Sequence, residues 1–114
     1  MSTIRAVRVE ACGAAEQMTV QSVPEPTPGV GEVRVRMSAC GINLIDTYHR
    51  SGLYPLPLPT GLGCEGAGVI DAVGEEVDDL VAGERVAFAM AMGAYAEAIV
   101  LPRASLVRIP DGVS

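Results

Sequence analysis

Hydrophobic and polar residues alternate along most of this chain in short runs that end at glycine or proline. The segment 32–42 reads EVRVRMSACGI, in which Val33, Val35 and Met37 alternate with two arginines. A period of two places such residues on opposite faces of a β-strand, so the pattern predicts a strand with one buried face. Comparable runs predict further strands at residues 3–13, 18–24, 66–74, 85–90, 93–102 and 105–110.

The segment 42–52, INLIDTYHRSG, predicts a short helix instead. Asn43 can cap its start, Asp46 is acidic in its first turn, and Gly52 can end it. The sequence VAGERV at 81–86 is typical of a hairpin connection. Together these elements predict a mainly β domain, a partly open β-barrel with one or two short helices. The chain shows no βαβ alternation, which argues against a doubly wound sheet.

A glycine-rich stretch at 60–68, TGLGCEGAG, contains the G-x-G-x-x-G spacing of dinucleotide-binding loops. That loop requires a central strand before it and a helix after it. Here three prolines of YPLPLPT precede the stretch and remove backbone donors, while β-branched residues of GAGVIDAVG follow it and favour a strand. We therefore do not expect the dinucleotide to bind at these glycines.

Composition narrows the classes of function further. The chain has 114 residues, of which 49% are hydrophobic, and is expected to fold as one domain over residues 1–114. Its net charge is -6, and all eight basic residues are scattered arginines. Binding to nucleic acid or to an anionic membrane needs clustered cations, so neither partner is expected.

Cysteine content and hydropathy indicate a cytoplasmic protein. Cys12, Cys40 and Cys64 are odd in number and widely spaced, which favours reduced thiols over disulfides. The N-terminal segment MSTIRAVRVE lacks the apolar core of a signal peptide, and no apolar run approaches the roughly 20 residues that span a bilayer.

Several separated motifs carry a family resemblance. Residues 39–74, followed by VAGERV and GAYAE, closely resemble the N-terminal, GroES-like domain of the medium-chain dehydrogenase/reductase superfamily. The resemblance extends over residues 4–114. Within it, GINLIDTYHRSGLYP is similar to the zinc-independent, NADPH-dependent quinone oxidoreductases. It implies a GroES-like β-barrel that orients a quinone or a related α,β-unsaturated carbonyl compound for hydride transfer.

The same resemblance implies that cofactor binding belongs mainly to a Rossmann domain, which is absent from this chain. We accordingly expect the isolated 114-residue domain to be inactive, and the full-length enzyme to use NADPH and to form a homodimer. The resemblance also predicts that apolar faces that meet the second domain are exposed in this chain.

The resemblance also bears on metals. The zinc-dependent relatives bind their catalytic metal at the positions of Asn43 and Cys64, and an amide is not the soft anionic ligand that zinc favours. The loop that holds a second, structural zinc in many relatives is absent as well. No metal is expected, because a zinc site would need an improvised set such as Cys40, His49, Cys64 and Glu65.

Without a metal, a carbonyl group must be oriented by hydrogen bonds. The resemblance assigns this catalytic role to Asn43, Tyr48 and Tyr54, and cofactor contacts to Asn43, Asp46 and Tyr48. Each has a structural alternative: Asn43 and Asp46 are well suited to the start of a helix, and both tyrosines can simply pack on the barrel.

Four further residues receive structural interpretations. Cys64 is interpreted as a small buried hydrophobic residue, and Glu65 as a partly buried carboxylate that needs a partner. His49 is expected at the surface of the short helix, and Tyr95 in the interior of the domain.

Other functions stay open at this point. An enoyl-thioester reductase of the same superfamily has the same motifs, because these do not fix the electron acceptor. A non-enzymatic GroES-like binding or assembly module is a second class, although a purely structural barrel does not require the segment from Asn43 to Tyr54. A metal-binding protein is the third.

Overall fold

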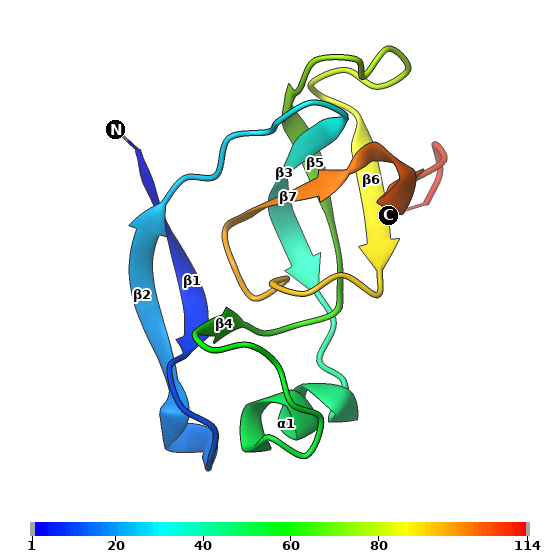
Figure 1. Ribbon diagram of the computed structural model, residues 1–114. Coiled ribbons are helices and arrows are strands. Elements are labelled where there is room, and N and C mark those ends of the chain that lie inside the picture. Colours follow the sequence, from blue (N-terminus) through cyan, green and yellow to red (C-terminus); the bar gives the residue numbers. More distant parts are fainter. Residues whose placement is uncertain (1, 114) are drawn as a thin grey trace.

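The computed structural model describes residues 2–113 and contains two antiparallel sheets and one α-helix (Figure 1). In chain order the elements are β1 (Thr3–Val9), the 3-10 helix η1 (Ala15–Gln17), β2 (Met18–Pro24), β3 (Glu32–Cys40), α1 (Leu44–Ser51), β4 (Thr60–Gly61), β5 (Glu65–Val73), β6 (Arg85–Ala89), β7 (Ala98–Pro102), the 3-10 helix η2 (Arg103–Ser105) and β8 (Val107–Arg108).

The larger sheet has the strand order β7-β3-β5-β6-β8, and the smaller one has the order β2-β1-β4. All pairings are antiparallel. The sheets are joined where β1 runs beside the segment before β7: the Val7 N–H donates to the carbonyl of Tyr95 at 2.8 Å, and the Glu97 N–H donates to that of Arg5 at 3.0 Å. This connection closes the domain only in part, as a partly open barrel requires.

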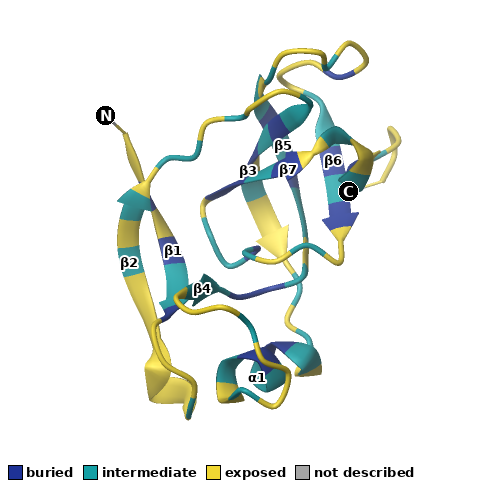
Figure 2. Ribbon diagram, viewed as in Figure 1, coloured by how far each residue is buried: buried dark blue, intermediate teal, exposed yellow. Residues whose placement is uncertain are grey.

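The hydrophobic core is formed by buried residues of β3, β5, β6 and β7 in the larger sheet and of the loops around them (Figure 2). Val33 and Val35 are fully buried in β3, and they pack with Ile70 of β5 and Val86 of β6. The intervening Arg34 and Arg36 lie on the other face and pair with Asp71. The alternation in the sequence therefore predicted the buried face of β3 correctly.

Helix α1 lies at one end of the molecule, beyond β4 and next to the end of β3 and the start of β5 (Figure 1). The glycine-rich stretch 60–68 contains β4, the link at 62–64 and the start of β5. It passes directly from one strand to another, and no helix follows it. The expectation that a strand, and not a helix, follows these glycines is confirmed.

Several predicted strands are too long. Residues 10–13 of the predicted strand 3–13 lie beyond β1, and only Val107–Arg108 of the predicted strand 105–110 form β8. Residues 93–97 lie outside β7, because Gly93 turns the chain at a φ of +102° and only Ala96 makes a single bridge, to Ala6. Within residues 2–113, no helix has the length and apolar character needed to cross a membrane.

Candidate active site around Asn43

The candidate site is built on the first turn of α1. Asn43 is the N-cap residue, with extended backbone, and its N–H donates to the Asp46 carboxylate at 3.0 Å. At the other end, Gly52 has a left-handed φ of +91°, and its N–H donates to the carbonyl of Tyr48 at 3.1 Å. The helix therefore begins and ends where the sequence predicted.

The Asn43 side chain contacts Glu65, the first residue of β5. Its Nδ2 donates to Oε2 of Glu65 at 3.0 Å. Since a carboxylate only accepts, this contact fixes which end of the amide faces Glu65. Glu65 itself is exposed, and the prediction that it is partly buried was wrong, although its expected hydrogen-bonding partner exists and is Asn43.

Asp46 is the buried polar centre of this end of the domain, with only 4% of its surface exposed. Its Oδ2 accepts from the Tyr95 hydroxyl at 2.5 Å as well as from the N-cap backbone, and its Oδ1 lies 3.5 Å from the Cys64 thiol. Both oxygens are thus engaged within the chain. From the sequence, Asp46 was predicted to contact the cofactor and Tyr95 to lie inside the domain. Their pairing across 49 positions was not predicted.

Burial and the Asp46 carboxylate act together on two neighbouring acids. Burial first, and the hydrogen bond to Asp46 second, raise the pKa of the Tyr95 hydroxyl well above its usual range. The same two causes, in the same order, raise the pKa of the Cys64 thiol. A raised pKa favours the protonated thiol of Cys64, which argues against a role as a nucleophile.

Tyr48 and Tyr54 contact each other. Their ring centroids lie 5.2 Å apart at an interplanar angle of 67°, an edge-to-face arrangement. Tyr48 is half-buried and Tyr54 is 48% exposed. Neither ring lines the two cavities that border Asn43, so the structure brings the tyrosines together but leaves them to one side of the amide.

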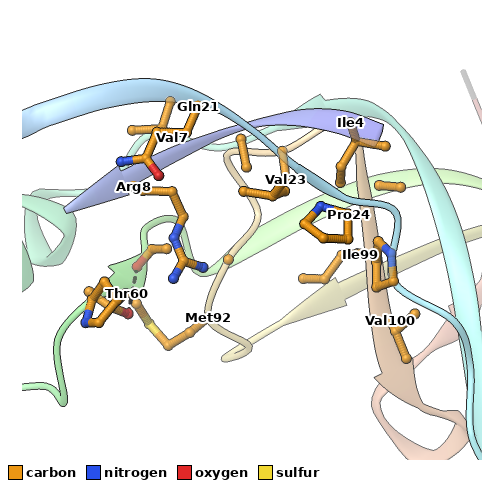
Figure 3. A pocket seen from close by; sticks show the side chains of 17 residues that line it. Ile4, Val7, Arg8, Gln21, Val23, Pro24, Thr60, Met92, Ile99 and Val100 are labelled. Carbon is orange, nitrogen blue, oxygen red and sulfur yellow. Dashed lines mark hydrogen bonds between the residues drawn. The ribbon is translucent and has the colours of Figure 1, made fainter. Parts of the chain in front are cut away.

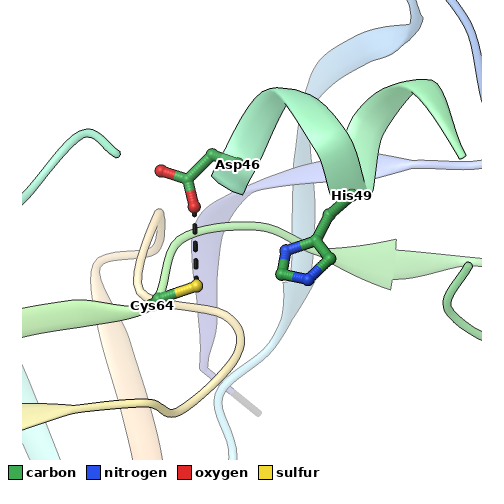
Figure 4. A group of neighbouring side chains, drawn as sticks. All are labelled: Asp46, His49 and Cys64. Atoms are coloured by element: carbon green, nitrogen blue, oxygen red, sulfur yellow. Dashed lines mark hydrogen bonds between the residues drawn. The ribbon is translucent and has the colours of Figure 1, made fainter. Parts of the chain in front are cut away.

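His49 is buried, so its predicted place at the surface was wrong. Only 9% of it is exposed, and its Nδ1 is buried without a hydrogen-bonding partner in the described part of the chain. The ring lies 6.3 Å from that of Tyr54 and points toward Asp46 and Cys64 (Figure 4). Potential metal ligands of Asp46, His49 and Cys64 all fall within 4.8 Å of one another. The set foreseen from sequence contained Cys40 and Glu65 in place of Asp46.

Two cavities flank Asn43. One, of about 470 Å³, is lined by His49, Cys64 and Met92 among others; the second, of about 600 Å³, is lined by Asp46 and Tyr95 with mainly apolar neighbours. A further cavity of about 640 Å³ lies between β1, β2 and the segment before β7 (Figure 3). Its lining is largely aliphatic, and it includes none of the predicted site residues.

Comparison with known proteins identifies the family. Residues 29–111 match the alcohol dehydrogenase GroES-like domain. The chain belongs to this domain family, within the medium-chain dehydrogenase/reductase superfamily, and the predicted resemblance and fold class are confirmed.

Its relatives include quinone oxidoreductases. The chain is 50% identical over 109 residues to the quinone oxidoreductase of Pseudomonas aeruginosa, covering 94% of this chain and 34% of that protein. The crystal structure of the Pseudomonas syringae pv. Tomato DC3000 quinone oxidoreductase superposes with a TM-score of 0.93 at 47% identity, covering 97% of this chain and 35% of that one. The crystal structure of the Escherichia coli quinone oxidoreductase complexed with NADPH superposes with a TM-score of 0.93 at 38% identity. The match covers 96% of this chain and 34% of that one. This chain therefore spans about a third of the length of these relatives.

Proposed function

We propose that this chain is the substrate-orienting domain of an NADPH-dependent reductase of quinones or related α,β-unsaturated carbonyl compounds. In this proposal hydride transfer needs no metal at the positions used by zinc-dependent relatives. The observation that carries the proposal is the Asn43 amide, held by Glu65 at the border of two cavities. A fixed hydrogen-bond donor beside an open cavity is what a carbonyl-polarising site requires.

Asn43 has capacity to spare for a substrate. Its side-chain NH₂ group carries two donors, of which one is used by Glu65. The second N–H is available to donate to a substrate carbonyl oxygen as negative charge develops there. The contact to Glu65 restricts rotation of the amide, so little reorganisation is needed when substrate binds.

The other predicted site residues, Tyr48, Tyr54 and Asp46, have different proposed roles. Tyr48 and Tyr54 line neither cavity, so we propose that their hydroxyl groups and rings contact only the part of a quinone that extends beyond the cavities. Their mutual contact holds the two rings in place. Asp46 is buried, and both of its carboxylate oxygens contact groups of its own chain. We therefore propose that it positions Asn43 and the start of α1 and contacts neither the cofactor nor the substrate.

The cavities beside Asn43 fit a nicotinamide ring and a small acceptor. Their volumes fall within the range of roughly 300–1,000 Å³ typical of small-molecule sites. When bound, NADPH supplies the hydride. Relatives with about three times the length of this chain support the proposal, since one is a quinone oxidoreductase crystallised with NADPH.

A second domain has a natural place to dock. Ile42, Leu44 and Met90 border the cavities and are 87%, 68% and 90% exposed. Large apolar side chains gathered in this way mark contact surfaces. We propose that a cofactor-binding domain covers them and closes the cavities from solvent.

The test is a chimera in which this chain replaces its matching segment in the Pseudomonas aeruginosa quinone oxidoreductase. We expect it to oxidise NADPH with a quinone, and the 114-residue chain alone to be inactive. An enoyl thioester serves as the competing acceptor. A higher kcat/KM for the thioester would identify an enoyl reductase, and a folded chimera inactive with both acceptors would refute a role in reduction.

A further inference from the structure

We propose that Asp46, His49 and Cys64 form a binding site for one zinc ion, which joins α1 to the link between β4 and β5. The three residues supply a carboxylate oxygen, an imidazole nitrogen and a sulfur, which are the ligand types that zinc takes in proteins. Of the two positions that the resemblance assigns to the zinc-dependent relatives, this set uses only that of Cys64. Asn43 is not among the three, and Asp46 and His49 are additional ligands.

The first observation is the spacing of the ligand atoms. All three lie within 4.8 Å of one another (Figure 4). Ligands about 2.0 and 2.3 Å from a zinc ion at the tetrahedral angle lie about 3.5 Å apart. That is the separation of Asp46 Oδ1 and Cys64 Sγ, so the ion can take the place of the proton between them. The ligand nitrogen of His49 lies within the same 4.8 Å limit of both atoms.

The second observation is independent and concerns His49. A buried imidazole nitrogen that lacks a partner is costly, because it has lost its contact with water and gained none in exchange. Nδ1 of His49 is in this state, and the ring points toward Asp46 and Cys64. A metal ion at this point satisfies the nitrogen.

The neighbouring cavity gives a zinc ion access to the site and leaves room for a water molecule as the fourth ligand. His49 and Cys64 line the cavity of about 470 Å³, so an ion can enter and water can complete a tetrahedral set. Met92 Sδ lies 3.9 Å from Cys64 Sγ, but a neutral thioether suits Cu⁺ better than Zn²⁺. We therefore expect zinc to bind without Met92. Binding replaces the thiol proton of Cys64, which is released to solvent.

The experiment uses the 114-residue chain and Zn²⁺ alone, so its outcome is separate from that of the reductase proposal. Equilibrium dialysis with metal analysis should give one zinc per chain. Cys64→Ser and His49→Gln should each weaken binding at least tenfold, whereas Cys40→Ser and Met92→Leu should leave it unchanged. Co²⁺ should show a thiolate charge-transfer band that Cys64→Ser abolishes.

The Tm, measured by thermal unfolding with and without zinc, shows whether each variant is folded and whether it binds the ion. Zinc should raise the Tm of the natural chain and of Cys40→Ser, but not that of Cys64→Ser, because only a folded site binds the ion. Absence of stoichiometric zinc, or equal binding by natural chain and a folded Cys64→Ser variant, would overturn the site. A tenfold loss in Met92→Leu would also contradict it, since the ligand set would then be a different one.

Discussion

Two glycines determine how closely the polar groups around α1 approach one another. Gly63 has a φ of +95°, and a Cβ there would lie 2.7 Å from the ring of Tyr95. At Gly41 a Cβ would lie 2.5 Å from Oε1 of Glu65. Side chains at these positions would displace the tyrosine from Asp46 and the carboxylate from Asn43. The absence of a side chain at Gly41 and Gly63 therefore allows the contacts of Glu65 with Asn43 and of Tyr95 with Asp46.

At the same scale, the Tyr95 hydroxyl should contribute measurably to stability. Tyr95→Phe removes a hydrogen-bond donor from the buried carboxylate of Asp46. The loss should lower the free energy of unfolding by about 1–3 kcal/mol. Urea unfolding measures this loss. Tyr54→Phe is the matched control, because Tyr54 is half-exposed and should change stability by less than about 0.5 kcal/mol. Equal stability of both variants would contradict the assigned contact.

At the scale of elements, the pairing of β3 with β5 is reinforced by ion pairs on its outer face. Asp71 of β5 lies 2.8 Å from Arg34 and 2.6 Å from Arg36, both of β3. Burial alone would raise the pKa of Asp71, but hydrogen bonds from the two arginines outweigh it and the pKa is lowered. The strands are thus held by hydrophobic contacts on one face and by charge on the other.

This lowered pKa makes stability depend on pH. Asp71 contributes fully above the unfolded pKa of about 4, and its contribution is lost as pH falls through the lower folded value. At pH 6, Asp71→Asn should reduce the free energy of unfolding by about 1–2 kcal/mol, and the difference should shrink toward pH 2. Denaturant unfolding at both pH values tests this. Asp78→Asn, at an exposed position, should show little change at either. A difference that grows on acidification would refute the assignment.

Elements with local signals were predictable from sequence. Helix α1 has its cap at Asn43 and its left-handed end at Gly52, and the alternation in β3 identifies Val33 and Val35 as buried. The burial of His49 was not predictable, because it depends on segments that pack on α1 from elsewhere in the chain. The same holds for the contact of Asp46 with Tyr95, which no local pattern encodes.

At the scale of the whole molecule, two sheets position α1 so that Asn43 meets Glu65 of β5 while Asp46 meets Tyr95 of the segment before β7. The membership of the GroES-like domain family followed from the order of several separated motifs, whereas the roles of the site residues stay a prediction. Ile42 and Met90 are exposed at this end, and they belong to the surface on which we propose that a cofactor-binding domain docks.

The most direct test of the account is the kcat/KM for a quinone in the chimera when Asn43 is changed. Loss of a preorganised donor to the developing charge should lower kcat/KM on the order of 10²-fold in Asn43→Ala. Asn43→Ser keeps a good helix cap and should fall at least tenfold with Tm retained. Cys12→Ser, an exposed site, should match the unmodified chimera. A kcat/KM unchanged in both Asn43 variants would contradict the claim that this amide orients the carbonyl.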